Sequence, residues 1–146
     1  MRTLLRLAVL VLAVAACAGR GATGGSGTGA GSPRAAVDQF LRAVKAQDLQ
    51  ALSTIWGTAE GPARDRMDRA ELERRELLMM CYLSHESYLV QEETGGERGT
   101  RVFRLAITRS GTTKPSTFTT VLGPADRWYV QDADLTALQA NCERRR

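Results

Sequence analysis

Apolar residues recur at helical spacing in the segment that begins near residue 33. Positions i, i+3, i+4 and i+7 would form one stripe on a helix: Val37, Phe40, Leu41 and Val44. Ser32 followed by Pro33 favours a helix start, because serine caps the first turn and proline has no N–H to leave unbonded. Asp48 would cap a second, shorter helix that ends at Gly57 and has an apolar face of Leu49, Leu52, Ile55 and Trp56. The pattern therefore predicts two short helices in tandem.

A third helix is predicted after the breaker formed by Gly61 and Pro62. Asp68 with Glu71 three residues later resembles a capping box. The first half of this helix mixes acidic and basic residues, so it would be a solvent face with an ion pair between Glu71 and Arg75; a docking patch is the alternative. The second half is apolar on most sides, and we expect it to be buried: Leu77, Leu78, Met80, Cys81 and Tyr82.

From residue 88 onward the period of apolar residues changes to two, the period of a strand. Four strands are predicted, at residues 88–93, 101–108, 117–122 and 127–131, and short turns between them make the sheet antiparallel. Phe103, Leu105 and Ile107 would share one face of the second strand. A short helix at about residues 134–141 would close the chain. The order predicts one α+β domain over residues 33–142, with N-terminal helices packed on one face of a curved four-stranded sheet.

The first sixteen residues have the layout of a signal peptide. Arg2 and Arg6 lie in a basic start, and residues 7–16 are only Leu, Ala and Val. This apolar run is well short of the roughly 20 residues that a membrane-spanning helix needs. We therefore expect residues 1–16 to direct export and to be removed.

The run ends in a sequence of small residues before a cysteine: Val14, Ala15, Ala16 and Cys17. These four residues resemble the lipobox of bacterial lipoproteins, which implies cleavage before Cys17 and attachment of lipid to its thiol. An ordinary secretory signal cut near Ala16 is the alternative. In that family an aspartate after the cysteine favours retention at the inner membrane. Ala18 stands there in this chain, which implies the outer membrane, facing the periplasm, in a Gram-negative host.

The segment behind Cys17 has the composition of a flexible linker. Residues 18–32 contain seven glycines and no large apolar residue, so residues 17–32 are expected to be a lipidated cysteine and a tether. The formal net charge of +4 comes from the two ends of the chain, including a basic tail at residues 143–146. Residues 33–142 carry 14 Lys and Arg against 15 Asp and Glu. A domain with a net charge of −1 does not indicate nucleic acid as a partner.

Three cysteines in an exported chain require an explanation. Lipid on Cys17 would leave Cys81 and Cys142 as a pair in a compartment that permits disulfides. Two unrelated buried thiols are the alternative. A bridge would stabilise the fold by roughly 4 kcal/mol in the chain-entropy model.

The helices and the late strand resemble a known superfamily. Residues 35–44 (AAVDQFLRAV), residues 48–52 (DLQAL) and residues 127–130 (RWYV) are similar to the NTF2-like superfamily of cone-shaped domains, including its small exported lipoproteins. The resemblance spans residues 33–132. It implies helices on a curved sheet that encloses a cavity. Another helix-on-sheet fold, such as a cystatin-like domain, is the alternative.

The sequence carries no recognisable catalytic motif, so we do not expect an enzyme. The single histidine, His85, has no placed nucleophile of the kind that a hydrolase triad needs. No metal or cofactor site is expected, because two paired cysteines and one histidine leave no zinc ligand set and no nucleotide-binding glycine loop is present. Enzymes of the NTF2-like superfamily pair an aspartate with a histidine or tyrosine. His85 with Glu86 or Tyr82 is the constellation here that resembles this, and a surface histidine is the alternative.

Binding is the function that the sequence favours. Seven large side chains would either line a cavity under the sheet or fill the core: Trp56, Met79, Met80, Tyr82, Phe103, Phe118 and Trp128. We expect a membrane-anchored, non-catalytic module of the cell envelope that binds an envelope protein, a peptide or an apolar small molecule. A small isomerase-like or hydrolase-like enzyme of the cone type, using His85, is the alternative. A purely structural lipoprotein is a third hypothesis.

Overall fold

The computed structural model describes residues 27–142, in which three α-helices precede a four-stranded sheet. The helices are α1 (Pro33–Ala46), α2 (Leu49–Ile55) and α3 (Arg69–Tyr82). The sheet strands are β3 (Ser87–Gly95), β4 (Arg101–Arg109), β5 (Thr112–Leu122) and β6 (Trp128–Ala133). Two two-residue strands, β1 (Gly57–Thr58) and β2 (Gly61–Pro62), and four 3₁₀ turns complete the described part: η1 (Ala63–Asp65), η2 (Glu97–Gly99), η3 (Pro124–Asp126) and η4 (Thr136–Cys142).

The three predicted helix caps are present. The Ser32 side chain accepts a hydrogen bond from the backbone N–H of residue 35 at 3.2 Å, and Asp48 accepts one from residue 51 at 2.9 Å. Asp68 accepts from two backbone N–H groups of the first turn of α3. Each cap satisfies donors that have no partner inside the helix, which explains where these helices begin. The predicted ion pair between Glu71 and Arg75 is also present.

The sheet is antiparallel throughout, in the order β3-β4-β5-β6. Phe103, Leu105 and Ile107 share the inner face of β4 and are buried, as their alternation predicts. The α+β class and the four-stranded antiparallel sheet are thus confirmed. Strand β5 begins at residue 112, five residues earlier than predicted, because Ser110 and Gly111 make the β4–β5 turn alone, both with positive φ.

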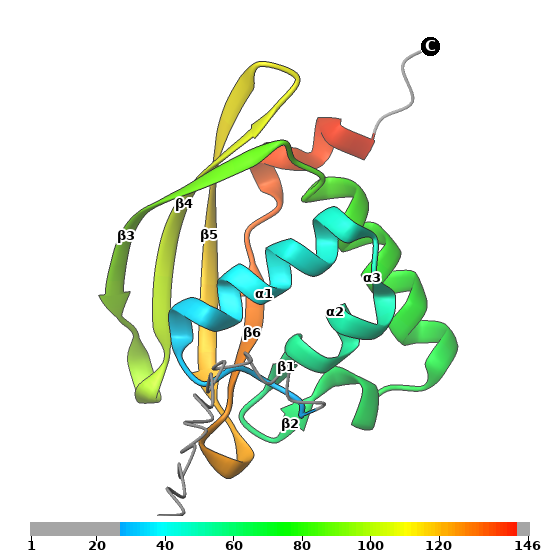
Figure 1. The fold of residues 1–146 in the computed structure, drawn as a ribbon, viewed down its shortest axis with the longest axis vertical. Helices are drawn as coiled ribbons and strands as arrows, with labels where there is room; N and C mark the ends of the chain where they lie inside the picture. The colour runs from blue at the N-terminus through cyan, green and yellow to red at the C-terminus, as the bar shows by residue number, and fades with distance from the viewer. Residues whose placement is uncertain (1–26, 143–146) are drawn as a thin grey trace, which may run out of the picture.

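Helix α1 lies across the inner face of the sheet, and α2 and α3 pack against α1 on the side away from β3 (Figure 1). The predicted apolar stripe of α1 is buried at all four of its positions. The ring of Phe40 meets that of Phe118 on β5 edge to face, with centroids 5.8 Å apart. The hydrophobic core therefore lies between α1 and the sheet.

The second half of α3 does not follow its prediction. Leu77 and Leu78 are 52% and 53% exposed, so the expectation that this end is buried is wrong for them. The buried residues of α3 are instead Leu72, Glu76 and Met80, which are spaced four apart and share one side of the helix. Residues 77 and 78 follow Glu76 by one and two positions and therefore point away from that side.

The short helix expected at the end of the domain is present as a 3₁₀ helix, η4. Its Leu138 is buried in the core. Cys142 at its end forms a disulfide with Cys81, with Cα atoms 5.4 Å apart, so the predicted pairing is confirmed. The Asn141 side chain donates a hydrogen bond to the Tyr82 carbonyl at 2.7 Å, which holds η4 on the last turn of α3.

The last six residues of the expected tether lie against the domain, and we call residues 27–32 the N-terminal strap. Ala30 is fully buried and exchanges two backbone hydrogen bonds of 2.8 Å with Trp128 on β6. The Arg127 guanidinium donates to the carbonyls of Thr28 and Gly29 at 3.1 and 2.6 Å. Gly29 has a φ of +69°, and a Cβ there would lie 2.8 Å from the Arg127 side chain. Backbone pairing and an arginine clamp thus hold the strap on the edge of the sheet.

Several expectations fall on residues that the structure does not describe. The signal peptide at residues 1–16, the lipidation site Cys17, the tether up to residue 26 and the basic tail at residues 143–146 lie outside residues 27–142. Between residues 27 and 142, no helix is both long enough and apolar enough to cross a bilayer.

Candidate functional site

An open cleft of about 590 Å³ lies where α2, η1 and α3 meet, and we call it the α2–α3 cleft. Its wall combines three apolar side chains with charged and polar ones: Leu49, Met67 and Leu72 with Gln50, Ser53, Arg64, Arg69, Glu73 and Glu76. Helix α3 supplies four of these residues, at positions 69, 72, 73 and 76. The spacing of three and four puts them on the side of α3 that faces α2.

Glu76 is the unusual residue of this cleft. Its side chain is only 2% exposed, and its Oε1 has no hydrogen-bond partner among the described residues. It replaces an apolar residue in the buried stripe of α3, four residues after Leu72 and four before Met80. Burial raises the pKa of Glu76 to about 7, and the negative charge of Glu73 raises it further. Near neutral pH this carboxyl group is therefore present in both protonation states.

Burying a carboxyl group without partners is costly. A core position of this kind normally holds a leucine or methionine, which would stabilise the fold instead. Glu76 is among the residues that line the cleft, so its carboxyl group lies beside the space that a bound molecule would occupy. The arrangement can accept a hydrogen bond or a positive charge from a ligand.

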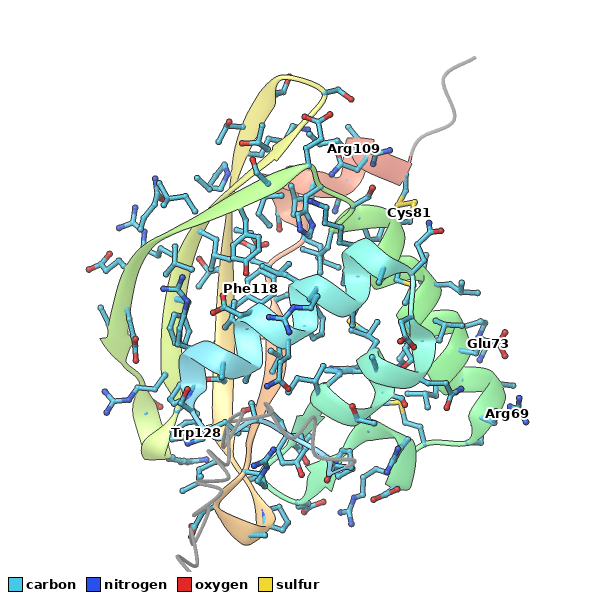
Figure 2. The ribbon with its side chains drawn as sticks, in the orientation of Figure 1. Arg69, Glu73, Cys81, Arg109, Phe118 and Trp128 are labelled. Atoms are coloured by element: carbon cyan, nitrogen blue, oxygen red, sulfur yellow. A yellow bond between two sulfur atoms is a disulfide. The ribbon has the colours of Figure 1, made fainter. Side chains whose placement is uncertain are left out.

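Two arginines line the same cleft. Arg64 lies on η1, and its Nε is 3.7 Å from the Asp65 carboxylate, a separation too long for a hydrogen bond. Arg69 lies in the first turn of α3, and Figure 2 shows it near Glu73 along this helix. The cleft therefore carries two positive and two acidic side chains around an apolar wall.

A second, smaller cleft of about 330 Å³ contains His85, and we call it the His85 cleft. Its other lining residues come from α1 and the start of β3: Asp38, Arg42, Lys45, Glu86, Ser87 and Tyr88. The His85 ring is 8% exposed and meets the Tyr88 ring edge to face, with centroids 5.6 Å apart. The Tyr88 hydroxyl donates a hydrogen bond of 2.8 Å to Asp38.

The surroundings of His85 and Tyr88 in this cleft determine which of their atoms carry hydrogen. Nδ1 of His85 is 2.8 Å from the Leu83 carbonyl, which only accepts, so Nδ1 carries the hydrogen and Nε2 is the basic nitrogen. The pKa of His85 is lowered, mainly by burial and to a smaller extent by the positive charge of Lys45. The hydrogen bond to the Leu83 carbonyl opposes this shift but does not cancel it. Burial, together with the hydrogen bond to Asp38, raises the pKa of Tyr88 to about 12. The neutral histidine is thus a potential base beside a protonated tyrosine.

The partners expected for His85 differ from those it has. Glu86 turns its carboxylate to the backbone N–H of Ser110 at 2.9 Å, and Tyr82 is on the last turn of α3. The structure instead places Tyr88 against the His85 ring, and Tyr88 bonds to Asp38, 50 residues away in the sequence. Sequence reasoning missed both residues, because only the packing of α1 against β3 brings them together.

The seven large side chains proposed as a cavity lining are part of the core. Phe103 and Phe118 are fully buried, and Met80 is 8% exposed. The remaining four are partly buried and packed against the same cluster: Trp56, Met79, Tyr82 and Trp128. None of the seven lines the α2–α3 cleft or the His85 cleft, but Met80 lines a further cleft of about 490 Å³ beside Cys81. Sequence reasoning also missed Glu76, although its position between Leu72 and Met80 was a signal that it shares their side of the helix.

The described residues contain no group of three or more His, Cys, Asp or Glu side chains arranged to hold a metal ion. Comparisons of the chain with protein-family models, with curated proteins and with solved structures each gave no match.

Proposed function

We propose that this chain is a lipid-anchored binding module of the cell envelope and that the α2–α3 cleft is its ligand site. The basic start, the short apolar run and the lipobox that ends at Cys17 support this localisation in the cell envelope. Attachment is through lipid on that cysteine, at the outer membrane facing the periplasm in a Gram-negative host. The domain belongs to the NTF2-like class of helices on a curved sheet, and it binds without catalysing a reaction.

One observation carries the choice of site. Glu76 is almost completely buried, one of its oxygens has no partner among the described residues, and it lines an open cleft. A ligand with an ammonium group or another strong donor would supply the missing partner. Such charge-assisted hydrogen bonds are among the stronger polar contacts in proteins. A fold that keeps an acid in this position gives up stability, which is a common cost of a binding site.

Titration with n-butylammonium chloride tests the site. Wild-type protein should bind this probe, and Glu76→Gln should bind it much more weakly, because the amide keeps the shape of the side chain but has no negative charge. Binding should weaken up to about tenfold per pH unit below pH 7, since a proton competes with the ammonium group for Glu76. Wild-type protein that binds no ammonium probe at pH 8 would contradict the proposal.

The anchor is tested separately. Cys17→Ala should release the protein from the membrane fraction and remove the lipid from its N-terminal peptide in mass spectrometry. A Cys17→Ala protein that stays in the membrane as firmly as the wild type would contradict lipid attachment at this residue.

The His85 cleft favours a second candidate, a small isomerase-like or hydrolase-like enzyme of the cone type. The supporting observation is that Nε2 of His85 is the basic nitrogen, beside Tyr88 in one cleft. In this mechanism Nε2 removes a proton from a substrate carbon or from water. Hydrolysis of p-nitrophenyl acetate and exchange of α-protons of a simple ketone are suitable assays. Activity that persists unchanged in His85→Gln would contradict this candidate.

A further inference from the structure

The two kinds of charge in the α2–α3 cleft are arranged along α3. Arg69 is in the first turn of the helix, and Glu76 follows it by seven residues on the same side. Seven residues of α-helix correspond to roughly 10 Å along the axis. Arg64 reaches the same cleft from η1, which precedes α3.

The two arginines do not neutralise Glu76. Arg64 and Arg69 form no ion pair with Glu76 within 4.0 Å in the described residues. The influences on the Glu76 carboxyl group are its burial and the negative charge of Glu73, and both raise its pKa. If a guanidinium were close, it would lower this pKa instead. The acid and the arginines therefore present opposite charges at separate places in one cleft.

The wall of the cleft between these charges contains apolar side chains. Leu49 on α2, Leu72 on α3 and Met67 before α3 contribute to it. Leu72 is buried and Met67 is half-buried, so this part of the cleft wall is apolar and would favour contact with hydrocarbon over contact with water. A purely ionic ligand would leave this surface without a partner.

We propose that the ligand of the α2–α3 cleft is a small zwitterion, with an ammonium group at Glu76, a carboxylate at Arg69 and Arg64, and a short hydrocarbon chain between them. This proposal rests on the proposed function, since it takes the same cleft as the binding site. The two arginines can each offer paired N–H donors, which suit a carboxylate. The buried acid accepts the ammonium group, and the apolar wall covers the methylene groups.

Calorimetric titration of the full chain, purified in detergent at pH 8, tests the ligand class with three matched probes. The probes are 6-aminohexanoate, which has both charges, n-pentylammonium, which lacks the carboxylate, and hexanoate, which lacks the ammonium group. We expect 6-aminohexanoate to bind at least tenfold more tightly than either of the others. Arg69→Gln and Arg64→Gln should each lower its affinity several-fold toward that of n-pentylammonium, and neither should weaken the binding of n-pentylammonium.

Two further variants separate the site from general charge effects. Glu76→Gln should weaken both ammonium probes at least tenfold. Arg74→Gln changes an arginine of the same helix that pairs with Glu71 and does not line the cleft, so it should change no affinity. The urea midpoint of each variant shows whether it is folded, and the two arginine positions test the carboxylate contact independently.

The outcomes distinguish this inference from the function on which it rests. If n-pentylammonium binds wild type as tightly as 6-aminohexanoate, and Glu76→Gln weakens both, the zwitterion is excluded and the cation site stands. If hexanoate binds best, and binds wild type and Glu76→Gln alike, the arginines form an anion site and the zwitterion is again excluded. If none of the three probes binds, both the ligand class and the proposed function are wrong.

Discussion

Replacing Glu76 by glutamine should stabilise the fold at neutral and alkaline pH. The folded protein holds a proton on this residue up to about pH 7, whereas the unfolded chain releases it near the ordinary value of 4.5. Between these two pH values the unfolded chain therefore binds fewer protons than the folded one. Linkage then requires that stability fall as the pH rises through this window and stay low above it. Glutamine does not titrate, so the variant loses this dependence.

The shift of the Glu76 pKa sets the size of the effect. A change from 4.5 to about 7 corresponds to roughly 3 kcal/mol at about 1.4 kcal/mol per pKa unit. The cleft is open to water, which screens part of the cost of the charge. We therefore expect Glu76→Gln to be more stable than wild type by about 2 kcal/mol at pH 8. At pH 4, where wild type is protonated in both states, the difference should be within about 0.5 kcal/mol.

Urea unfolding followed by circular dichroism, at several pH values between 4 and 8, measures this difference. Glu73→Gln is the matched control, because Glu73 is exposed on the same helix and lines the same cleft. Its own effect should be small, and it should move the stability loss of wild type slightly toward lower pH, since the Glu73 charge raises the pKa of Glu76. Parallel stability curves for wild type and Glu76→Gln over the whole range would refute the assignment of a buried, titrating acid.

Three further predictions concern stability, and urea unfolding measures each of them. Changing Cys81 and Cys142 together to serine should cost about 4 kcal/mol, because the disulfide closes a loop of 61 residues. Gly29→Ala should cost about 2 kcal/mol or more, since a Cβ would collide with Arg127 and Tyr129 at a positive φ. Tyr88→Phe should cost about 1 kcal/mol through loss of its 2.8 Å hydrogen bond to Asp38.

Each of these predictions has an internal control. Dithiothreitol should destabilise wild type as much as the double serine change does, and should leave the double variant unaffected. Gly27 has open space around the position of a Cβ, so Gly27→Ala should be nearly neutral, and equal stability of the two alanine variants would contradict the clamp on the strap. If Tyr88→Phe and Tyr82→Phe unfold at the same urea concentration, the hydrogen bond to Asp38 contributes no net stability.

Local patterns predicted the elements whose period is set by one buried face. The apolar stripe of α1 and the alternation in β4 predict both the type of element and the side that is buried. In a strand with one buried face every second residue is apolar, and in such a helix every third or fourth residue is. The helix caps could also be predicted, because their contacts are local: Ser32, Asp48 and Asp68 accept hydrogen bonds from N–H groups only two or three residues away.

The features that local patterns did not predict depend on distant partners. A run of apolar residues in α3 does not say which side faces the protein, and the position of α2 decides that Glu76 points inward and Leu77 outward. A glycine-rich segment has the composition of a linker, and only the edge of β6, about a hundred residues later, provides the contacts that hold Gly29 and Ala30. The candidate site lies where α2, η1 and α3 meet, so its residues had to come from the structure.

The disulfide has a mechanical consequence for a protein that is pulled from its two ends. Residues 81–142 contain every strand of the sheet, and the Cys81–Cys142 bond connects the ends of this segment covalently. Once the strap and the helices before Cys81 have been pulled away from the sheet, tension would pass from Cys81 directly through the sulfur atoms to Cys142, and the chain between them would carry no load. The segment between the two cysteines could then not be drawn out. Reducing the bond would release roughly 200 Å of additional chain, at about 3.3–3.6 Å per residue.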